Sequence, residues 1–226
     1  PYEAFSHLYA SLPWLLLGLF SFLETPNKRT LVTFATLSLL SSPANYIPTL
    51  FLVYLICVGV ILLFHAARTK QWKHVVAVLA VIMTINAYWL LPFASFVQHG
   101  TAFVSHTTIN RLFTEEAFLR NQKFGSIGDV AILRGFLFDT TDMIDTAKGA
   151  NDFMMKPWIA YLKNPAVYGL HIGLVAIVMI GFFISFRKKQ PHRAPLALIC
   201  AICVIALIND NPPTGGVFVL LQQYVP

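Results

Sequence analysis

The stretch PTLFLVYLICVGVILLFHA, residues 48–66, runs for nineteen residues without a Lys, Arg, Asp or Glu. A helix needs about 20 predominantly apolar residues to cross the hydrocarbon core of a bilayer, so this stretch predicts a membrane-spanning helix. Five other apolar runs are found along the chain: 8–23, 30–42, 74–93, 165–186 and 195–209. The sequence therefore predicts an all-α, polytopic transmembrane helix bundle of about six spans.

The composition of the chain agrees with a membrane location. Hydrophobic residues make up 57% and charged residues 12%, with a mean hydropathy of +0.66, whereas soluble domains carry about 25% charged residues. Cys57, Cys200 and Cys203 all lie inside apolar runs. The last two form a CxxC, which we interpret as helix packing because the run provides no polar partners for a redox or metal site.

Two of the apolar runs, 30–42 and 195–209, are shorter than an ordinary span. They cross the membrane only if flanking side chains such as Lys28, Arg29 and Arg193 extend to the headgroups. For the run 30–42, a half-buried or re-entrant helix is the alternative. The number of spans depends on these two runs.

Lysine and arginine are concentrated in three linkers between the runs. The linkers 24–29, 66–73 and 187–194 hold nine Lys and Arg residues. Their one acidic residue is Glu24. Cytoplasmic loops carry an excess of Lys and Arg, and with six spans all three linkers fall on one side. We expect that side to be the cytoplasm and the membrane to be the plasma membrane of a prokaryote.

The net charge of +6 reflects the Lys and Arg residues that flank the apolar runs, as expected for a membrane protein with this topology. Nucleic acid is not an expected partner, because the sequence has no basic face with exposed aromatic residues away from the membrane ends. The expected partners are the lipid bilayer and the rest of a longer chain, since both ends of the sequence look like cuts.

A polar insert divides the chain into three parts, 1–93 with four spans, the insert 94–164, and 165–226 with two spans and an outer loop. The insert faces outside in this topology. Within it, 109–123 and 126–138 have apolar residues at helical spacing, which predicts amphipathic helices that pack on the spans or lie on the membrane. We expect the insert to be mostly helix and irregular chain, because no stretch alternates cleanly with period two.

The insert also contains a regular group of acidic residues. Asp139, Asp142 and Asp145 recur at intervals of three, and this spacing places side chains on one face of a helix. Such carboxylates can bind a cation or a sugar, or act as bases; the alternative is a solvated helix face. Arg134 and Lys148 are basic partners nearby. We predict no metal site and no cofactor; a divalent cation is compatible with the carboxylates, but nothing indicates one.

Other polar residues lie close to the membrane. Asn86 is in the outer half of the run 74–93, so we expect it either to hydrogen-bond another helix or to line a substrate path. Asp210 is the only acidic residue in the loop after the last run, and it faces the same side as the insert in this topology. His99 and His106 share a helical face, but no further metal ligands accompany them.

Three short motifs occur in an order that resembles a family of membrane enzymes. They are LYASLPWL at 8–15, NAYWLLPF at 86–93 and NPPTGG at 211–216. Together they resemble the polytopic GT-C-type glycosyltransferases, in particular the arabinofuranosyltransferase-like membrane proteins. The resemblance implies transfer of a sugar from a polyprenyl-phosphate donor to an extracytoplasmic glycan acceptor. It also implies a catalytic acid in an outer loop after the family's first span, which we expect upstream of Pro1.

On this hypothesis the spans form a groove for a polyprenyl phosphate. Arg111, Arg120 or Arg134 would bind the phosphate, and a carboxylate of the insert would assist the acceptor hydroxyl as a general base. Two alternatives remain open. One is a transporter or flippase-like module in which Asn86 and Asp210 line a pathway, and the other is a non-catalytic assembly subunit whose insert binds a partner.

Overall fold

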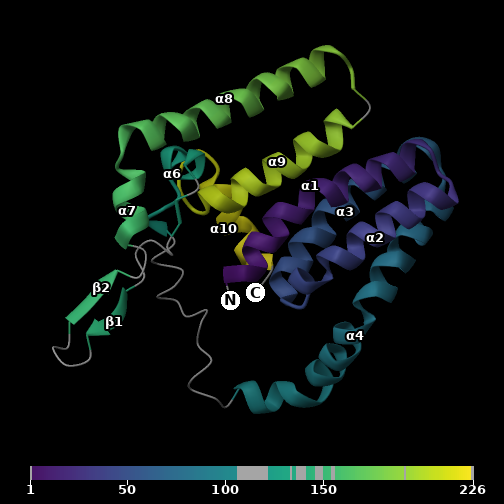
Figure 1. The fold of residues 1–226 in the computed structure, drawn as a ribbon, viewed down its shortest axis with the longest axis horizontal. Helices are drawn as coiled ribbons and strands as arrows, with labels where there is room; N and C mark the ends of the chain where they lie inside the picture. Colours follow the sequence, from purple (N-terminus) through teal and green to yellow (C-terminus); the bar gives the residue numbers. More distant parts are fainter. Residues whose placement is uncertain are drawn as a thin grey trace. The chain divides into compact units, whose positions relative to one another are not determined.

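The structure is a computed structural model that describes residues 2–105, 122–132, 134–135, 141–145, 150–153, 156–190 and 192–224. The chain forms two compact units, residues 1–109 and residues 110–226. Helices dominate both units (Figure 1). Four of them are long and apolar enough to cross a membrane: Ser6–Glu24, Pro48–Thr69, Trp72–His99 and Pro165–Arg187. The chain is therefore a helical membrane protein, as its apolar runs predict.

The first unit consists of four consecutive helices: α1 (Tyr2–Glu24), α2 (Lys28–Asn45), α3 (Pro48–Thr69) and α4 (Trp72–Ser105). Asn27 begins α2 with a capping box, in which its side chain accepts a hydrogen bond from the Thr30 N–H at 3.0 Å. Pro48 occupies the first turn of α3, where its missing N–H costs nothing. Lys70 ends α3 in a left-handed conformation, with φ of 59°. These signals make the connectors short and the successive helices antiparallel.

Contacts between the helices show which connectors lie together. The Phe22 ring meets the His74 ring edge-on at 5.7 Å, which joins the end of α1 to the start of α4. The His7 Nε2 atom lies 3.0 Å from the Leu40 carbonyl oxygen, which joins the start of α1 to the end of α2. The α1–α2 and α3–α4 connectors therefore lie at one end of the first unit, and the α2–α3 connector lies at the other.

The least apolar helix of the first unit, α2, nevertheless has a buried face. Its buried residues are Phe34, Ser38, Ser41, Ser42, Ala44 and Asn45. Small residues of this kind let helix backbones approach closely. A Cβ atom on Gly18 of α1 would lie 2.8 Å from the Leu37 side chain of α2, so α1 and α2 are in close contact there. Neighbouring helices thus cover the polar side chains that lower the hydropathy of this run.

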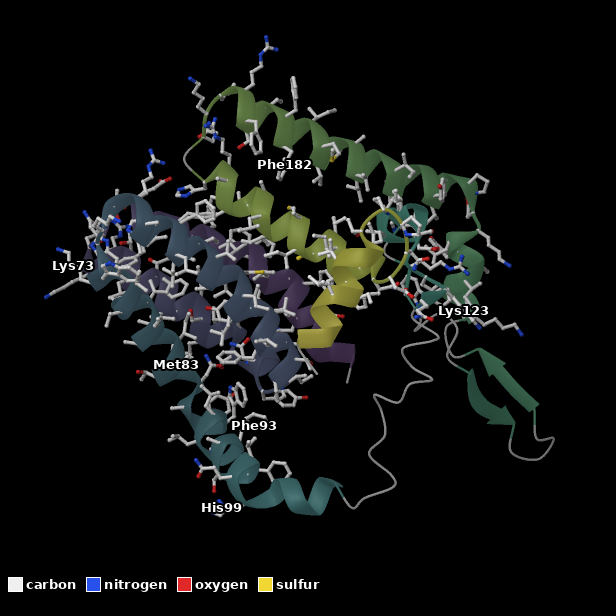
Figure 2. The ribbon with its side chains drawn as sticks, turned by 180° about the vertical axis from the view of Figure 1, so that it is seen from behind. Lys73, Met83, Phe93, His99, Lys123 and Phe182 are labelled. Atoms are coloured by element: carbon white, nitrogen blue, oxygen red, sulfur yellow. The ribbon has the colours of Figure 1, made fainter. Side chains whose placement is uncertain are left out.

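The fourth helix is longer than the sequence predicts. The apolar run ends at residue 93, but α4 continues to Ser105 with Pro92 inside it. Figure 2 labels Lys73, Met83, Phe93 and His99 along this helix. Proline in a helix interior removes one backbone hydrogen bond, and this one missing bond does not end the helix.

The second unit contains one hairpin of strands and several helices: α6 (Ile127–Ala131), β1 (Thr141–Asp145), β2 (Ala150–Phe153), α7 (Lys156–Leu162), α8 (Pro165–Arg187), α9 (Arg193–Ile208) and α10 (Gly215–Tyr224). The Asn164 side chain caps α8 by accepting a hydrogen bond from the Ala166 N–H at 2.9 Å. No residue of α8 is buried, and Phe183 is 67% exposed. Since α8 is also long enough to span a membrane, lipid is the environment that suits its surface.

The insert also contains two short strands that the sequence pattern does not predict. Strands β1 and β2 pair antiparallel, with Asp142 opposite Asp152 and an irregularity between Met143 and Asp145. Thr141 and Ile144 are β-branched and favour a strand over a helix. Because the hairpin is polar, it carries no alternating apolar pattern that would reveal it in the sequence.

The amphipathic helix expected at 126–138 is also wrong in extent. The helix α6 covers only Ile127–Ala131. The Arg134 N–H donates to the Asp129 carbonyl oxygen at 2.8 Å, which closes the turn that ends the helix. Most of the other expected amphipathic stretch, 109–123, lies outside the described residues.

Candidate functional site

The loop between α9 and α10 is held in shape by its own asparagine side chains. Asn209 has a positive φ of 51° with ψ of −127°. Its side-chain oxygen accepts hydrogen bonds from the Asp210 N–H at 2.7 Å and from Asn211 Nδ2 at 2.8 Å. The loop thereby presents Asp210 in one defined position.

This loop packs against residues 122–125 of the insert. Gln122 Nε2 donates to Asp210 Oδ2 at 2.7 Å, and Asn211 Nδ2 donates to the Gln122 carbonyl oxygen at 2.9 Å. A Cβ atom on Gly125 would overlap the Ile208 carbonyl oxygen and the Asn211 side chain. Only glycine fits this close approach. The insert and the last loop, which are far apart in the sequence, therefore form one structure.

The Asp210 carboxylate has an unused oxygen atom. Its Oδ1 atom is buried and has no hydrogen-bond partner among the described residues, and the same holds for the Thr214 hydroxyl. A buried polar atom without a partner costs about 1–3 kcal/mol, so such atoms call for an explanation. An acceptor in this state is suited to a donor that a ligand or a water molecule supplies.

A guanidinium group contacts the same insert segment. The Arg134 guanidinium carbon lies 5.2 Å from the centre of the Phe124 ring, and Phe124 is buried. Arg134 Nη1 lies 3.8 Å from Asp129 Oδ1, and the arginine side chain is 44% exposed. Exposed ion pairs at this distance contribute about 0–1 kcal/mol. Arg134 therefore keeps donors for an anionic ligand.

The predicted acidic group does not have the expected geometry. Asp142 and Asp145 lie on β1, so they do not share the face of a helix, and Asp139 lies outside the described residues. Arg111, Arg120 and His106 also lie outside them. The roles of the three aspartates as substrate contacts stay predictions, without the helical arrangement that motivated them.

Sequence reasoning missed the hydrogen-bond partners of Asp210, which are Gln122 and Asn209. The sequence contained two signals for this arrangement. One is the turn-dense segment 208–216, and the other is the placement of Asp210 on the same side as the insert. Hydropathy says nothing about which insert residue meets the loop, so the partner on the insert could not be identified from sequence.

Asn86 is an interhelical contact of the first unit. It is 1% exposed. Its side-chain oxygen accepts from Asn45 Nδ2 at 3.1 Å and from Trp89 Nε1 at 3.2 Å, and its Nδ2 donates to the Ile82 carbonyl oxygen at 2.8 Å. Of the two roles that the sequence left open, this geometry fits a hydrogen bond between helices.

Among the described residues, no three His, Cys, Asp or Glu side chains gather where they could bind a metal ion. Two histidines do lie together near the α3–α4 connector of the first unit, where His74 Nδ1 is 3.4 Å from His65 Nε2. His99 Nδ1 lies 3.0 Å from the Ser95 carbonyl oxygen of its own helix. Cys57, Cys200 and Cys203, which all lie in the described part of the chain, form no disulfide bond.

We compared the chain with protein families, with curated proteins and with solved structures, and no match was found. The resemblance to GT-C-type glycosyltransferases therefore depends on the three sequence motifs. The third motif is part of the loop described above, since 211–216 contains Asn211, Thr214 and Gly215. The identification that follows from these observations is a helical membrane protein with a polar site built from its insert and its last loop.

Proposed function

We propose that this chain is part of an integral membrane glycosyltransferase that moves a sugar from a polyprenyl-phosphate donor to an extracytoplasmic glycan acceptor. The observation that carries this function is that one insert segment, residues 122–124, contacts both a carboxylate and a guanidinium. Asp210 bonds to Gln122, and Arg134 stacks on Phe124 two residues later. A lipid-linked sugar presents hydroxyl groups and a phosphate, and these two side chains match them.

The proposed topology has six spans, with α2 and α9 included. The packing of α2 alongside α1 supports its crossing, because its polar side chains are covered by other helices. The 16 residues of α9 extend about 24 Å, and Arg193 at its start can reach the headgroups. The basic α1–α2 and α3–α4 connectors then face the cytoplasm, and the insert with residues 209–214 faces outside.

The chemistry assigned to the described residues is binding and orientation. The buried Oδ1 of Asp210 accepts a hydrogen bond from a sugar hydroxyl, and the Arg134 guanidinium donates to the donor phosphate. In the transfer, the acceptor oxygen bonds to the anomeric carbon while the bond from that carbon to the phosphate oxygen breaks. The polyprenyl phosphate leaves with the electron pair, and Arg134 stabilises its charge. The acceptor proton passes to a carboxylate of the insert, which acts as the general base.

The two alternative functions have weaker support. A transporter or flippase-like module would use Asn86 and Asp210 to line a pathway, but the hydrogen bonds of Asn86 are made to Asn45, Trp89 and Ile82. A non-catalytic assembly subunit would use the insert to bind a partner, and no described contact favours that role over substrate binding.

The experiment is a transfer assay with the full-length protein in lipid. A panel of polyprenyl-phosphate sugars serves as donors, and incorporation of labelled sugar into glycan is measured. We expect Asp210→Asn to lower kcat/KM at least tenfold, because the amide leaves a weaker acceptor in the same place. The matched control is Asp129→Asn, which removes the charge of the partly buried carboxylate near Arg134 and should change kcat/KM less than threefold.

Arg134 provides a second test of the same site. Arg134→Gln should raise the KM for the donor more than it lowers kcat, since the lost interaction is with the donor phosphate. Arg134→Lys should restore part of the affinity, because lysine keeps the charge but not the planar pair of donors. A folded full-length protein that transfers no sugar from any donor of the panel would contradict the proposed function.

A further inference from the structure

One end of the first unit carries a dense group of cations on its two connectors. Its members, which we name the basic end, are Lys28, Arg29, Arg68, Lys70 and Lys73. All five are exposed. The connectors are brought together by the contact of Phe22 with His74. Figure 2 labels Lys73 at the start of α4, at this end of the unit.

The backbone at this end is well defined. Asn27 caps α2 directly before Lys28 and Arg29. The Lys70 N–H donates to the Ala66 carbonyl oxygen at 2.8 Å, which closes the end of α3. The charge is therefore attached to helix ends, and the helices hold it at a fixed height.

Apolar side chains locate the membrane boundary at the same end. Leu63 and Phe64 near the end of α3, and Val76 near the start of α4, are exposed on spanning helices. Trp72 is exposed between them and the connector, and tryptophan is enriched at the level of lipid headgroups. The cations therefore lie where phospholipid phosphates lie, directly outside an apolar rim.

We propose that the basic end binds the anionic headgroups of phospholipids in the adjacent leaflet. Five cations and one acidic residue, Glu24, lie in the segments 24–29 and 66–73, so the local charge is strongly positive. Basic clusters directly beside spanning helices attract anionic lipids. A lipid fits this end better than a soluble anion does, because its acyl chains cover the apolar rim while its phosphate meets the cations. This proposal does not depend on the proposed sugar site.

The experiment uses the full-length protein reconstituted in nanodiscs of phosphatidylcholine and phosphatidylglycerol in equal amounts. After extraction into mild detergent, the lipids that remain bound are quantified by mass spectrometry. We expect phosphatidylglycerol to be enriched at least threefold over phosphatidylcholine. The enrichment should fall by half or more in 0.5 M NaCl, a salt concentration at which exposed charges are screened beyond roughly 4 Å.

The variant carries Lys28→Gln, Arg29→Gln, Arg68→Gln and Lys73→Gln, and it leaves Lys70 in place because of its left-handed backbone. It should retain the two lipids in nearly equal amounts. One control exchanges Lys and Arg at the same four positions and should keep the enrichment. A second control, Lys123→Gln with Lys163→Gln, removes exposed cations elsewhere and should also keep it.

Equal retention of both lipids by the wild-type protein would overturn the proposal. So would an enrichment that the four-residue variant keeps. If loss of charge prevents correct insertion of the variant, the proposal is tested by the salt dependence of the phosphatidylglycerol enrichment in the wild-type protein. An enrichment that 0.5 M NaCl leaves unchanged would then exclude an electrostatic headgroup site at this end.

Discussion

Replacing Asn86 by alanine should destabilise the first unit by weakening the contact between α2 and α4. The Asn86 oxygen accepts hydrogen bonds from Asn45 and Trp89, and its amide donates to the Ile82 carbonyl oxygen. The Trp89 ring also packs edge-on against Phe51 of α3 at 5.1 Å. Asn86 therefore accepts a hydrogen bond from Asn45 of α2, and it also orients the Trp89 side chain, whose ring contacts α3.

The structure gives the magnitude of this effect. An interhelical hydrogen bond in a membrane protein contributes about 0.6 kcal/mol on average and at most about 1.7 kcal/mol. Alanine at residue 86 also leaves the Asn45 amide and the Trp89 N–H without this acceptor, and a buried unpaired group costs about 1–3 kcal/mol. Because the two groups relax in part, we expect Asn86→Ala to lower the free energy of unfolding by about 2–4 kcal/mol.

The assay is reversible unfolding by sodium dodecyl sulfate in mixed micelles, followed by circular dichroism. A double-mutant cycle of Asn45→Ala and Asn86→Ala should give a coupling energy of about 0.6–1.7 kcal/mol. Tyr88→Phe is the control, since it removes only the hydroxyl that donates to the Ser42 carbonyl oxygen at 3.2 Å. Strictly additive effects, or a loss below about 0.5 kcal/mol for Asn86→Ala, would refute the assignment of Asn86 as a contact between helices.

Three other predictions concern the two units and the membrane. Gly125→Ala should separate the insert from the last loop and lower the free energy of unfolding by about 2–4 kcal/mol. The added Cβ atom would break the hydrogen bond from Asn211 to the Gln122 carbonyl oxygen and the neighbouring bond from Gln122 to the Asp210 carboxylate. Unchanged stability would contradict the packing of the insert against this loop. In sealed vesicles of a cysteine-free variant, introduced cysteines at Ser126 and Gln190 should be labelled from opposite sides, and labelling from one side would exclude the six-span topology. Gly18→Leu should cost about 1–3 kcal/mol of stability through overpacking against α2, measured in the same micelle assay, where a neutral effect would show that the helices separate easily.

Hydropathy predicts the parts of this fold in which burial in lipid alone determines the structure. The run 48–66 becomes α3, and the run 165–186 becomes α8. Hydropathy is less informative for α2, because Ser38 and Asn45 are polar yet each is no more than 2% exposed. Their burial depends on α1, α3 and α4, and a local window contains no information about those neighbours. The three-residue spacing of acidic residues also predicted the wrong element, since β-branched neighbours and pairing with β2 favour a strand there.

The contacts between polar residues in the candidate site are even harder to predict from the sequence than the helices are. Gln122 and Asp210 are 88 residues apart and meet at 2.7 Å. The contact depends on Gly125, whose missing side chain lets the insert approach the Ile208 carbonyl oxygen. A glycine in a loop has many common roles, so its sequence context does not reveal a close approach. The structure identifies this role because it shows the atoms that a Cβ would meet.

The state of each buried polar group separates structural roles from binding roles in this chain. Asn86 has all the partners that its position between helices requires, so its bonds stabilise the first unit. In the same unit the Ser38 and Tyr54 hydroxyls are buried and have no hydrogen-bond partner among the described residues. These groups are uncharged and buried, so a bridging water molecule would satisfy them and they require no larger ligand. Asp210 differs in both respects, because its carboxylate is ionisable and the residue is only partly buried. Among the described residues, Asp210 has one oxygen without a partner, and the insert segment that bonds to it also contacts Arg134; this combination is why we propose the polar substrate site there.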